Sequence, residues 1–112
     1  MKRKVLEWCG WEKFDDIRWR KKDDPHSTFF RNEEMPDLEH DLNAWFCEGG
    51  PVEKLEVAGW TYMEEPGEVV FFDDDDNEVK VGFDVYIRNL IERRCEALLV
   101  ATVQVIERIE NA

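Results

Sequence analysis

Three cysteines and two histidines are the side chains of this 112-residue sequence that could bind a soft metal or act as nucleophiles. Cys9, Cys47 and Cys95 are far apart, and no pair has the spacing of a zinc or redox motif. His40 and Cys47 are seven residues apart and would share a helix face, but no second pair is spaced to complete four zinc ligands. His26 lies beside a proline turn. We therefore expect no metal site, and we expect all three cysteines to pack in the core of a protein from a reducing compartment.

An acidic run is the next candidate for chemistry. It consists of Asp73, Asp74, Asp75 and Asp76. Four carboxylates could bind Ca²⁺, but the alternating ligands, the glycine and the final glutamate of a calcium loop are missing, which favours a solvated hairpin loop. The sequence also lacks a Gly-x-Ser-x-Gly elbow, a glycine-rich phosphate loop and a His-Glu-x-x-His motif. We expect a protein that is not an enzyme and uses no cofactor.

The negative charge is concentrated in the middle of the chain. The formal net charge is −12, and residues 33–84 contain seventeen acidic residues but only two basic ones, Lys54 and Lys80. Such a field repels a phosphate backbone and attracts a basic protein, so we expect no direct binding of nucleic acid. Solubility alone is the simpler interpretation of this charge.

A basic and aromatic stretch offers a different kind of site. Indoles could stack on a base and guanidinium groups could hold phosphates, which would suit a small nucleotide. The residues for such a site are Trp11, Arg18, Trp19 and Arg20, joined by Arg93 and Arg94 from further along the chain. The alternative is that the tryptophans are core residues and the charges form a solvated face.

The elements that would position these residues follow from the hydrophobic pattern. Helices are expected at residues 2–9, from Pro36 to the Gly49-Gly50-Pro51 break, and at about 86–109. Strands are expected at 17–20, 59–63 and 68–72, with a third strand of the same meander around Val79 and Val81. The predicted fold class is α+β, a compact single-domain sandwich over 1–112 of a small antiparallel sheet (three to four strands) and two or three helices including a long C-terminal helix.

Membrane and secretory segments are not expected, because the chain has no run of 18 apolar residues and no signal-peptide pattern. The expected location is the cytoplasm.

Three short motifs give the chain a family resemblance. They are VLEWCGW at residues 5–11, MPDL at 35–38 followed by DLNA at 41–44, and RCEAL at 94–98. With these pieces the chain resembles the small phage and prophage proteins described by the phage ABA sandwich domain. The resemblance implies an α/β sandwich, an origin in an infected or lysogenic bacterium and no established reaction. The motif positions are Pro36, Asp37, Asp41, Asn43, Arg94 and Glu96, of which Asp37 could instead be a helix N-cap and Asn43 a core polar group.

The leading hypothesis is a phage accessory protein that binds a host protein, which could counteract a host defence. Its acidic surface at residues 64–78, including Asp73 to Asp76, would steer the partner, and Trp60, Phe71 and Phe72 would anchor it. The alternatives are a protein that sequesters a nucleotide or other small ligand, and a structural or assembly component that forms a homo-oligomer.

Overall fold

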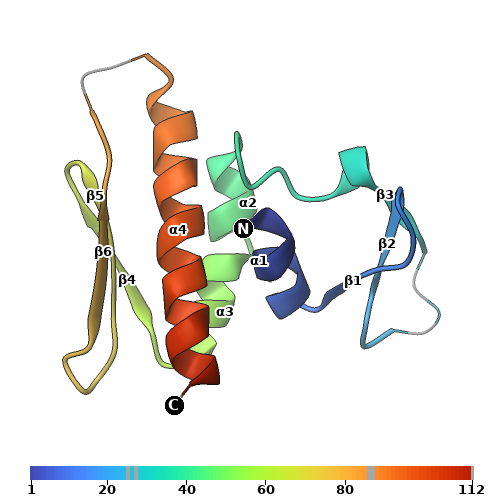
Figure 1. Cartoon of the computed structure of the whole chain (residues 1–112), viewed down its shortest axis with the longest axis horizontal. Coiled ribbons are helices and arrows are strands. Elements are labelled where there is room, and N and C mark those ends of the chain that lie inside the picture. Colours follow the sequence, from blue (N-terminus) through green and yellow to red (C-terminus); the bar gives the residue numbers. More distant parts are fainter. Residues whose placement is uncertain (25, 27, 86–87, 112) are drawn as a thin grey trace.

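The computed structural model describes residues 1–24, 26, 28–85 and 88–111, and shows an α+β fold (Figure 1). Its helices are α1 (Lys2–Trp8), the 3-10 turn η1 (Asn32–Glu34), α2 (Leu42–Phe46), α3 (Pro51–Val57) and α4 (Leu90–Glu110). Its strands are β1 (Trp11–Lys13), β2 (Arg18–Lys21), β3 (Phe30–Arg31), β4 (Thr61–Glu65), β5 (Glu68–Phe72) and β6 (Glu78–Gly82).

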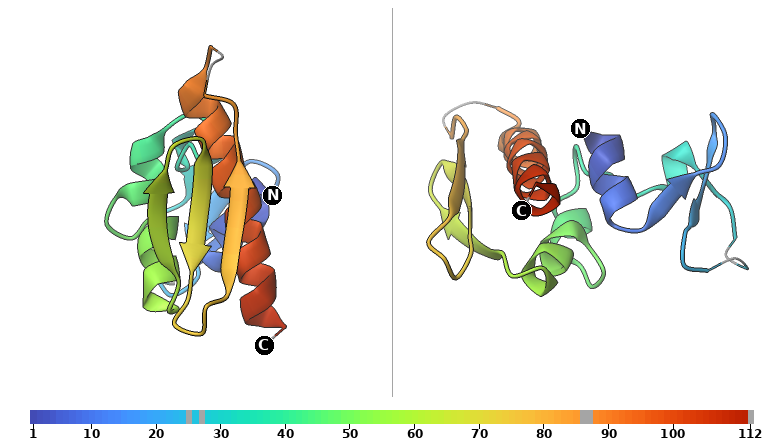
Figure 2. Two further views of the ribbon diagram at one scale, coloured as in Figure 1. Left: turned by 90° about the vertical axis from the view of Figure 1, so that its left-hand side faces the viewer. Right: turned by 60° about the horizontal axis from the view of Figure 1, so that its bottom comes forward.

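The elements are arranged in layers. The antiparallel sheet β4-β5-β6 lies at one end of the long axis and packs against α4. Helices α1, α2 and α3 lie on the other side of α4, and the second antiparallel sheet, β1-β2-β3, lies beyond α1 (Figures 1 and 2). The prediction of an α+β sandwich with a long C-terminal helix is confirmed.

The sheet β4-β5-β6 is the predicted meander. Its central strand β5 pairs with both neighbours, with Phe71 opposite Tyr62 on β4 and Val79 on β6. Side chains alternate between the two faces of a sheet, so Val69, Phe71 and Val79 all point toward α4 and are fully or almost fully buried. Helix α4 packs against this sheet on one side and against α1 on the other, and its buried residues are Cys95, Ala97, Leu98, Leu99, Ala101, Thr102, Val105 and Ile106.

The sheet β1-β2-β3 was not predicted: one sheet of three to four strands was expected, and the described part of the chain has two separate sheets of three strands each. The strand expected at residues 17–20 is present as β2, but it is the middle of three strands, with Trp19 opposite Lys13 on one side and Phe30 on the other. The outer strands are only three and two residues long, too short for an alternating pattern to stand out in the sequence.

The helix predicted from Pro36 begins later than expected. The Asp37 carboxylate accepts a hydrogen bond from the Glu39 amide at 3.2 Å and holds a turn. Asp41 is the N-cap of α2, and its carboxylate accepts from the Asn43 amide at 2.9 Å. The suggested cap at Asp37 and the suggested core position of Asn43, which is exposed, are therefore both wrong.

The Gly49-Gly50-Pro51 break does end α2, but a helix that the sequence analysis missed starts there. Gly50 is the N-cap of α3 and Pro51 its first residue, where proline has no amide hydrogen bond to lose. The last helix begins at Leu90, and the predicted start at Tyr86 falls on residues that the structure does not describe.

The core joins all the layers. Trp45 is fully buried and donates from Nε1 to the Leu38 carbonyl oxygen at 2.9 Å. Cys9 and Cys95 are buried as predicted, but Cys47 is exposed because it follows the last residue of α2, so its predicted core position is wrong. Across the described residues, no helix has the length and apolar character needed to cross a membrane.

Candidate functional site

The outer face of the sheet β4-β5-β6 is the candidate site, and it is called the open face below. Because β5 alternates, the residues in register with Val70 point away from α4. In the part of the chain that the structure describes, no helix packs over this side (Figure 2, left). The open face comprises Thr61, Met63, Glu65, Glu68, Val70, Phe72, Glu78 and Lys80.

A small apolar centre lies on the open face. Met63 is 38% exposed, and Phe72 is half-buried on the neighbouring strand. Val70 is fully buried although it lies outside the core cluster, and in the register it lies between Met63 and Lys80. The two large apolar side chains that reach solvent could therefore contact a partner directly.

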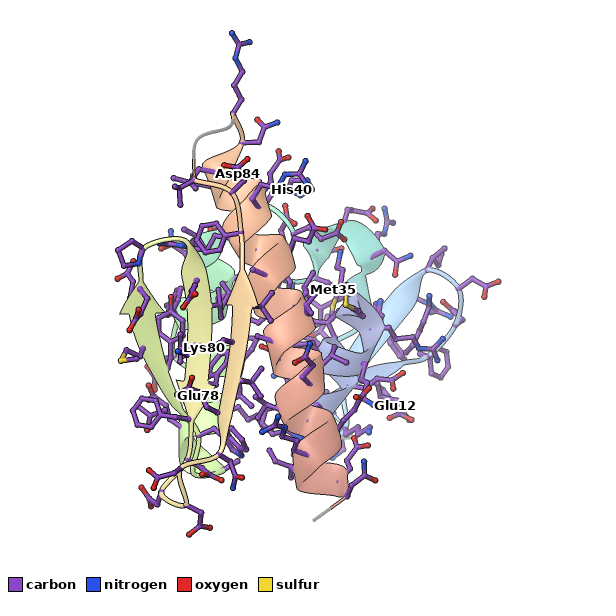
Figure 3. All side chains as sticks on the ribbon, turned by 60° about the vertical axis from the view of Figure 1, so that its left-hand side comes forward. Glu12, Met35, His40, Glu78, Lys80 and Asp84 are labelled. Carbon is purple, nitrogen blue, oxygen red and sulfur yellow. The ribbon has the colours of Figure 1, made fainter. Side chains whose placement is uncertain are left out.

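Acidic side chains surround this centre. Glu65 and Glu68 lie opposite each other at one end of the face, and Glu78 lies opposite Phe72 at the other end. Lys80, the basic residue among the strand residues of this face, forms an ion pair with Glu78 at 3.0 Å (Figure 3). The hydrogen bond to Glu78 and its negative charge raise the pKa of Lys80, and the charges of Glu68 and Glu65 raise it further. The net charge of the face is therefore negative, and the positive charge of Lys80 is balanced by Glu78.

The aspartate run forms the turn between β5 and β6, beside the open face. The Asp73 carboxylate accepts hydrogen bonds from the amides of Asp75 and Asn77 at 3.0 and 2.9 Å and from Asn77 Nδ2 at 2.9 Å. The side-chain bond from Asn77 is the main reason that the pKa of Asp73 is lowered. Asp73 thus holds the turn, whereas Asp74, Asp75 and Asp76 are exposed at its tip.

Two of the three predicted aromatic anchors are core residues. Trp60 is 6% exposed and Phe71 is fully buried against α4, with its ring centroid 5.5 Å from that of Tyr62. They are not available as surface anchors, and Phe72 alone reaches the open face. Met63 was not predicted as a surface neighbour of Phe72, and Glu65 and Glu68 were predicted only as part of the acidic surface at residues 64–78. Their shared parity along two paired strands was the signal that could have revealed them.

The residues of the predicted nucleotide site that come from the sheet β1-β2-β3 lie on opposite faces of that sheet. Trp11 and Trp19 lie on its inner face, where Trp19 Nε1 donates to Asn32 Oδ1 at 2.8 Å. Arg18 and Arg20 lie on the outer face with exposed phenylalanines that the sequence analysis did not single out. The Arg18 guanidinium lies 5.1 Å from the ring of Phe14 and 5.0 Å from that of Phe29.

The four arginines of that site are all ion-paired within the chain. Arg18 contacts Asp15 at 2.6 Å and Arg20 contacts Glu12 at 3.3 Å. Arg93 and Arg94, on α4, are paired with Glu96 at 3.2 Å and Glu64 at 2.9 Å. Strand β2 and α4 lie in different layers (Figure 1), so one chain does not bring the two pairs of arginines together.

A cavity of about 420 Å³ lies between α4 and the start of the chain, and its lining includes His40, Glu39, Glu92 and Glu96. His40 Nδ1 lies 3.0 Å from Asp37 Oδ1, and this hydrogen bond raises the pKa of His40. No group of three or more histidine, cysteine or carboxylate side chains among the described residues is arranged to hold a metal ion.

Comparison with family models, with curated proteins and with solved structures finds no match to this chain. The phage ABA sandwich resemblance therefore remains a hypothesis based on its short motifs.

Proposed function

We propose that this protein acts by binding a basic partner protein on its open face. The observation that carries the proposal is an uncovered sheet face on which Met63 and Phe72 are surrounded by Glu65, Glu68 and Glu78. Apolar side chains at the centre of a patch contribute most of the binding energy of a typical interface. A surrounding field of one sign increases the association rate with partners of opposite charge.

The motif resemblance extends this proposal to a phage accessory protein whose partner is a host protein in the bacterial cytoplasm. A protein that blocks a host factor needs a binding surface and no catalytic residues, which is consistent with the open face. The exposed Asp74, Asp75 and Asp76 at the turn would enlarge the negative field beside the face without contributing apolar contact.

The first experiment uses ¹⁵N-labelled protein and a synthetic peptide of alternating lysine and leucine as the probe. We expect amide shifts to change on β4, β5 and β6, and we expect the affinity to fall as salt is added. The double variant Glu65→Gln/Glu68→Gln should bind the peptide more weakly. The matched control is Glu33→Gln/Glu34→Gln, which removes two exposed carboxylates from η1 near the other sheet.

Equal weakening by the two double variants would show that net charge, and not the open face, attracts the peptide. Shifts that cluster outside the sheet would also overturn the proposal.

The host partner is tested separately by quantitative capture from a bacterial lysate. A host protein retained by the wild type and by the control, but lost by Glu65→Gln/Glu68→Gln and by Met63→Ala, would support the extension. The absence of any protein with this pattern would count against it.

A further inference from the structure

Strand β6 ends the sheet on the side away from β4, so one of its edges has no strand neighbour among the described residues. The Asp73 amide donates to Asn77 at 3.1 Å and the Phe83 amide donates to Gly67 at 2.8 Å, which marks the odd-numbered residues as the ones bonded to β5. The residues whose backbone amides and carbonyls point to the free edge are therefore Glu78, Lys80 and Gly82.

The charges along this edge are self-complementary. When two edge strands pair antiparallel, each residue whose backbone amide and carbonyl point to the edge must lie opposite a residue of the same kind on the other strand. If two copies of β6 pair with Glu78 at the centre, Glu78 lies opposite Glu78, and with Lys80 at the centre, Lys80 lies opposite Lys80. With Val81 at the centre, Glu78 lies opposite Asp84. A pair centred on Val79 places Glu78 opposite Lys80 twice. Opposite charges facing each other across two strands stabilise the pairing, and like charges oppose it.

We propose that β6 pairs antiparallel with β6 of a second copy of this chain, in the register centred on Val79, to give a twofold dimer with one continuous six-stranded sheet. The main-chain bonds of Glu78 and Lys80 to their counterparts would satisfy the edge, as in other cases of strand addition. The ion pair that Lys80 now makes with Glu78 of its own strand, at 3.0 Å, would be shared with Glu78 of the second copy.

An apolar groove beside β6 fits the same arrangement. A hollow of about 400 Å³ runs between β6 and α4, and its apolar lining comes from Val81, Phe83, Ala97 and Val100. The twofold axis stands perpendicular to the sheet, so the second copy brings its own α4 to the same side and covers this groove. The two open faces then lie together on the opposite side and form one wider acidic surface. The dimer would be bivalent toward a partner, although its formation does not depend on the proposed function.

Sedimentation velocity of the purified full chain over a range of concentrations tests the dimer. The wild type should show a monomer–dimer equilibrium. Lys80→Glu places glutamates opposite glutamates, and Glu78→Lys places lysines opposite lysines. Each should raise the dissociation constant about tenfold or more, because two attractive pairs become repulsive.

The decisive arm is a mixture of the two variants. The Lys80→Glu chain carries two glutamates at the edge and the Glu78→Lys chain carries two lysines, so the mixed pair restores both attractions. We expect a heterodimer from two proteins that are each monomeric alone. The swap Glu78→Lys/Lys80→Glu should likewise recover the homodimer, which also shows that the variants fold.

A wild type that stays monomeric at the highest attainable concentration would overturn the proposal, and Lys80 would then be an edge lysine that prevents strand pairing. A dimer that is unaffected by Lys80→Glu, or variants that do not combine, would also overturn it. Because Glu65→Gln/Glu68→Gln leaves Glu78 and Lys80 in place, this variant should dimerise like the wild type, and the peptide titration on it tests the proposed function separately from the dimer.

Discussion

Arg94 of α4 donates a hydrogen bond from Nη1 to Glu64 Oε1 of β4 at 2.9 Å, and so links the long helix to an edge of the sheet. The side chain of Glu64 is 66% exposed and that of Arg94 is 24% exposed. The Arg94 guanidinium also lies 5.5 Å from the ring of Phe83, and its Nε is buried without a hydrogen-bond partner among the described residues. The apolar stem of Arg94 should therefore matter more for stability than its charge.

Replacing Arg94 separates these two contributions. Arg94→Met keeps a long apolar stem and removes the unsatisfied Nε, so we expect the free energy of unfolding to change by less than about 1 kcal/mol. Arg94→Ala also loses the contact with Phe83 and should cost about 1–2 kcal/mol. Urea denaturation at neutral pH measures both. Equal costs for the two variants would show that the ion pair with Glu64 dominates.

Trp45 should be far more sensitive to substitution than its neighbour. Trp45→Phe leaves a cavity in the core and leaves the Leu38 carbonyl without its donor, so we expect a loss of about 2–4 kcal/mol. Phe46→Leu is the control. Because Phe46 is 45% exposed, this substitution should lower the free energy of unfolding by less than about 1 kcal/mol. Guanidinium denaturation followed by circular dichroism gives both values. A Trp45→Phe variant as stable as the control would contradict this account of the core.

The meander and the last helix could be predicted because their patterns are long. Residues Val69 to Phe72 of β5 are an unbroken run of β-branched and aromatic residues between two turns, and α4 repeats its apolar stripe over 21 residues. The start of α2 at Leu42 and the presence of α3 were not predicted. The spacing of Leu38, Leu42 and Trp45 fits one helical face, but the turn that Asp37 holds makes Leu38 precede the helix.

The candidate site was predicted in part. The acidic character of residues 64–78 needed only composition, whereas the facing of each aromatic needed the strand register. A shift of one residue moves a side chain to the other face, and this is the difference between buried Phe71 and half-buried Phe72. The same effect places Arg18 and Trp19 on opposite faces of β2.

The Asp73 carboxylate in the turn between β5 and β6 should make the free energy of unfolding depend on pH in the acid range. The pKa of Asp73 in the folded protein lies below 3.8, so its contribution is fully present above that pH and is lost as the pH falls through the folded-state pKa. Asp73→Asn should destabilise the protein at pH 7, and the difference from the wild type should shrink in acid. Urea midpoints over a pH series measure this.

The control for the turn is Asp74→Asn, because the Asp74 carboxylate accepts none of the bonds that hold it. Its urea midpoint at pH 7 should be close to that of the wild type. A wild-type to Asp73→Asn difference that stayed constant into acid would exclude the ionised carboxylate as the source of the effect.

The three thiols should react at two very different rates. Cys47 is exposed after α2, with only a weak contact of 3.6 Å from its sulfur to the Ala44 carbonyl oxygen. Burial raises the pKa of Cys9 to about 11, and burial is also the largest cause of the raised pKa of Cys95. Because the thiolate is the reactive form, both buried thiols combine poor access with little thiolate at pH 8.

A disulfide-exchange reagent should therefore modify one thiol quickly in the native protein and all three after denaturation. Cys47→Ser should abolish the fast phase, whereas Cys9→Ala should leave it intact. A fast phase that survives in Cys47→Ser would mean that the α1 or α4 layer opens often enough to expose a buried cysteine. The slow-phase rate, followed with increasing urea, then distinguishes local opening from global unfolding, because only global unfolding depends steeply on denaturant.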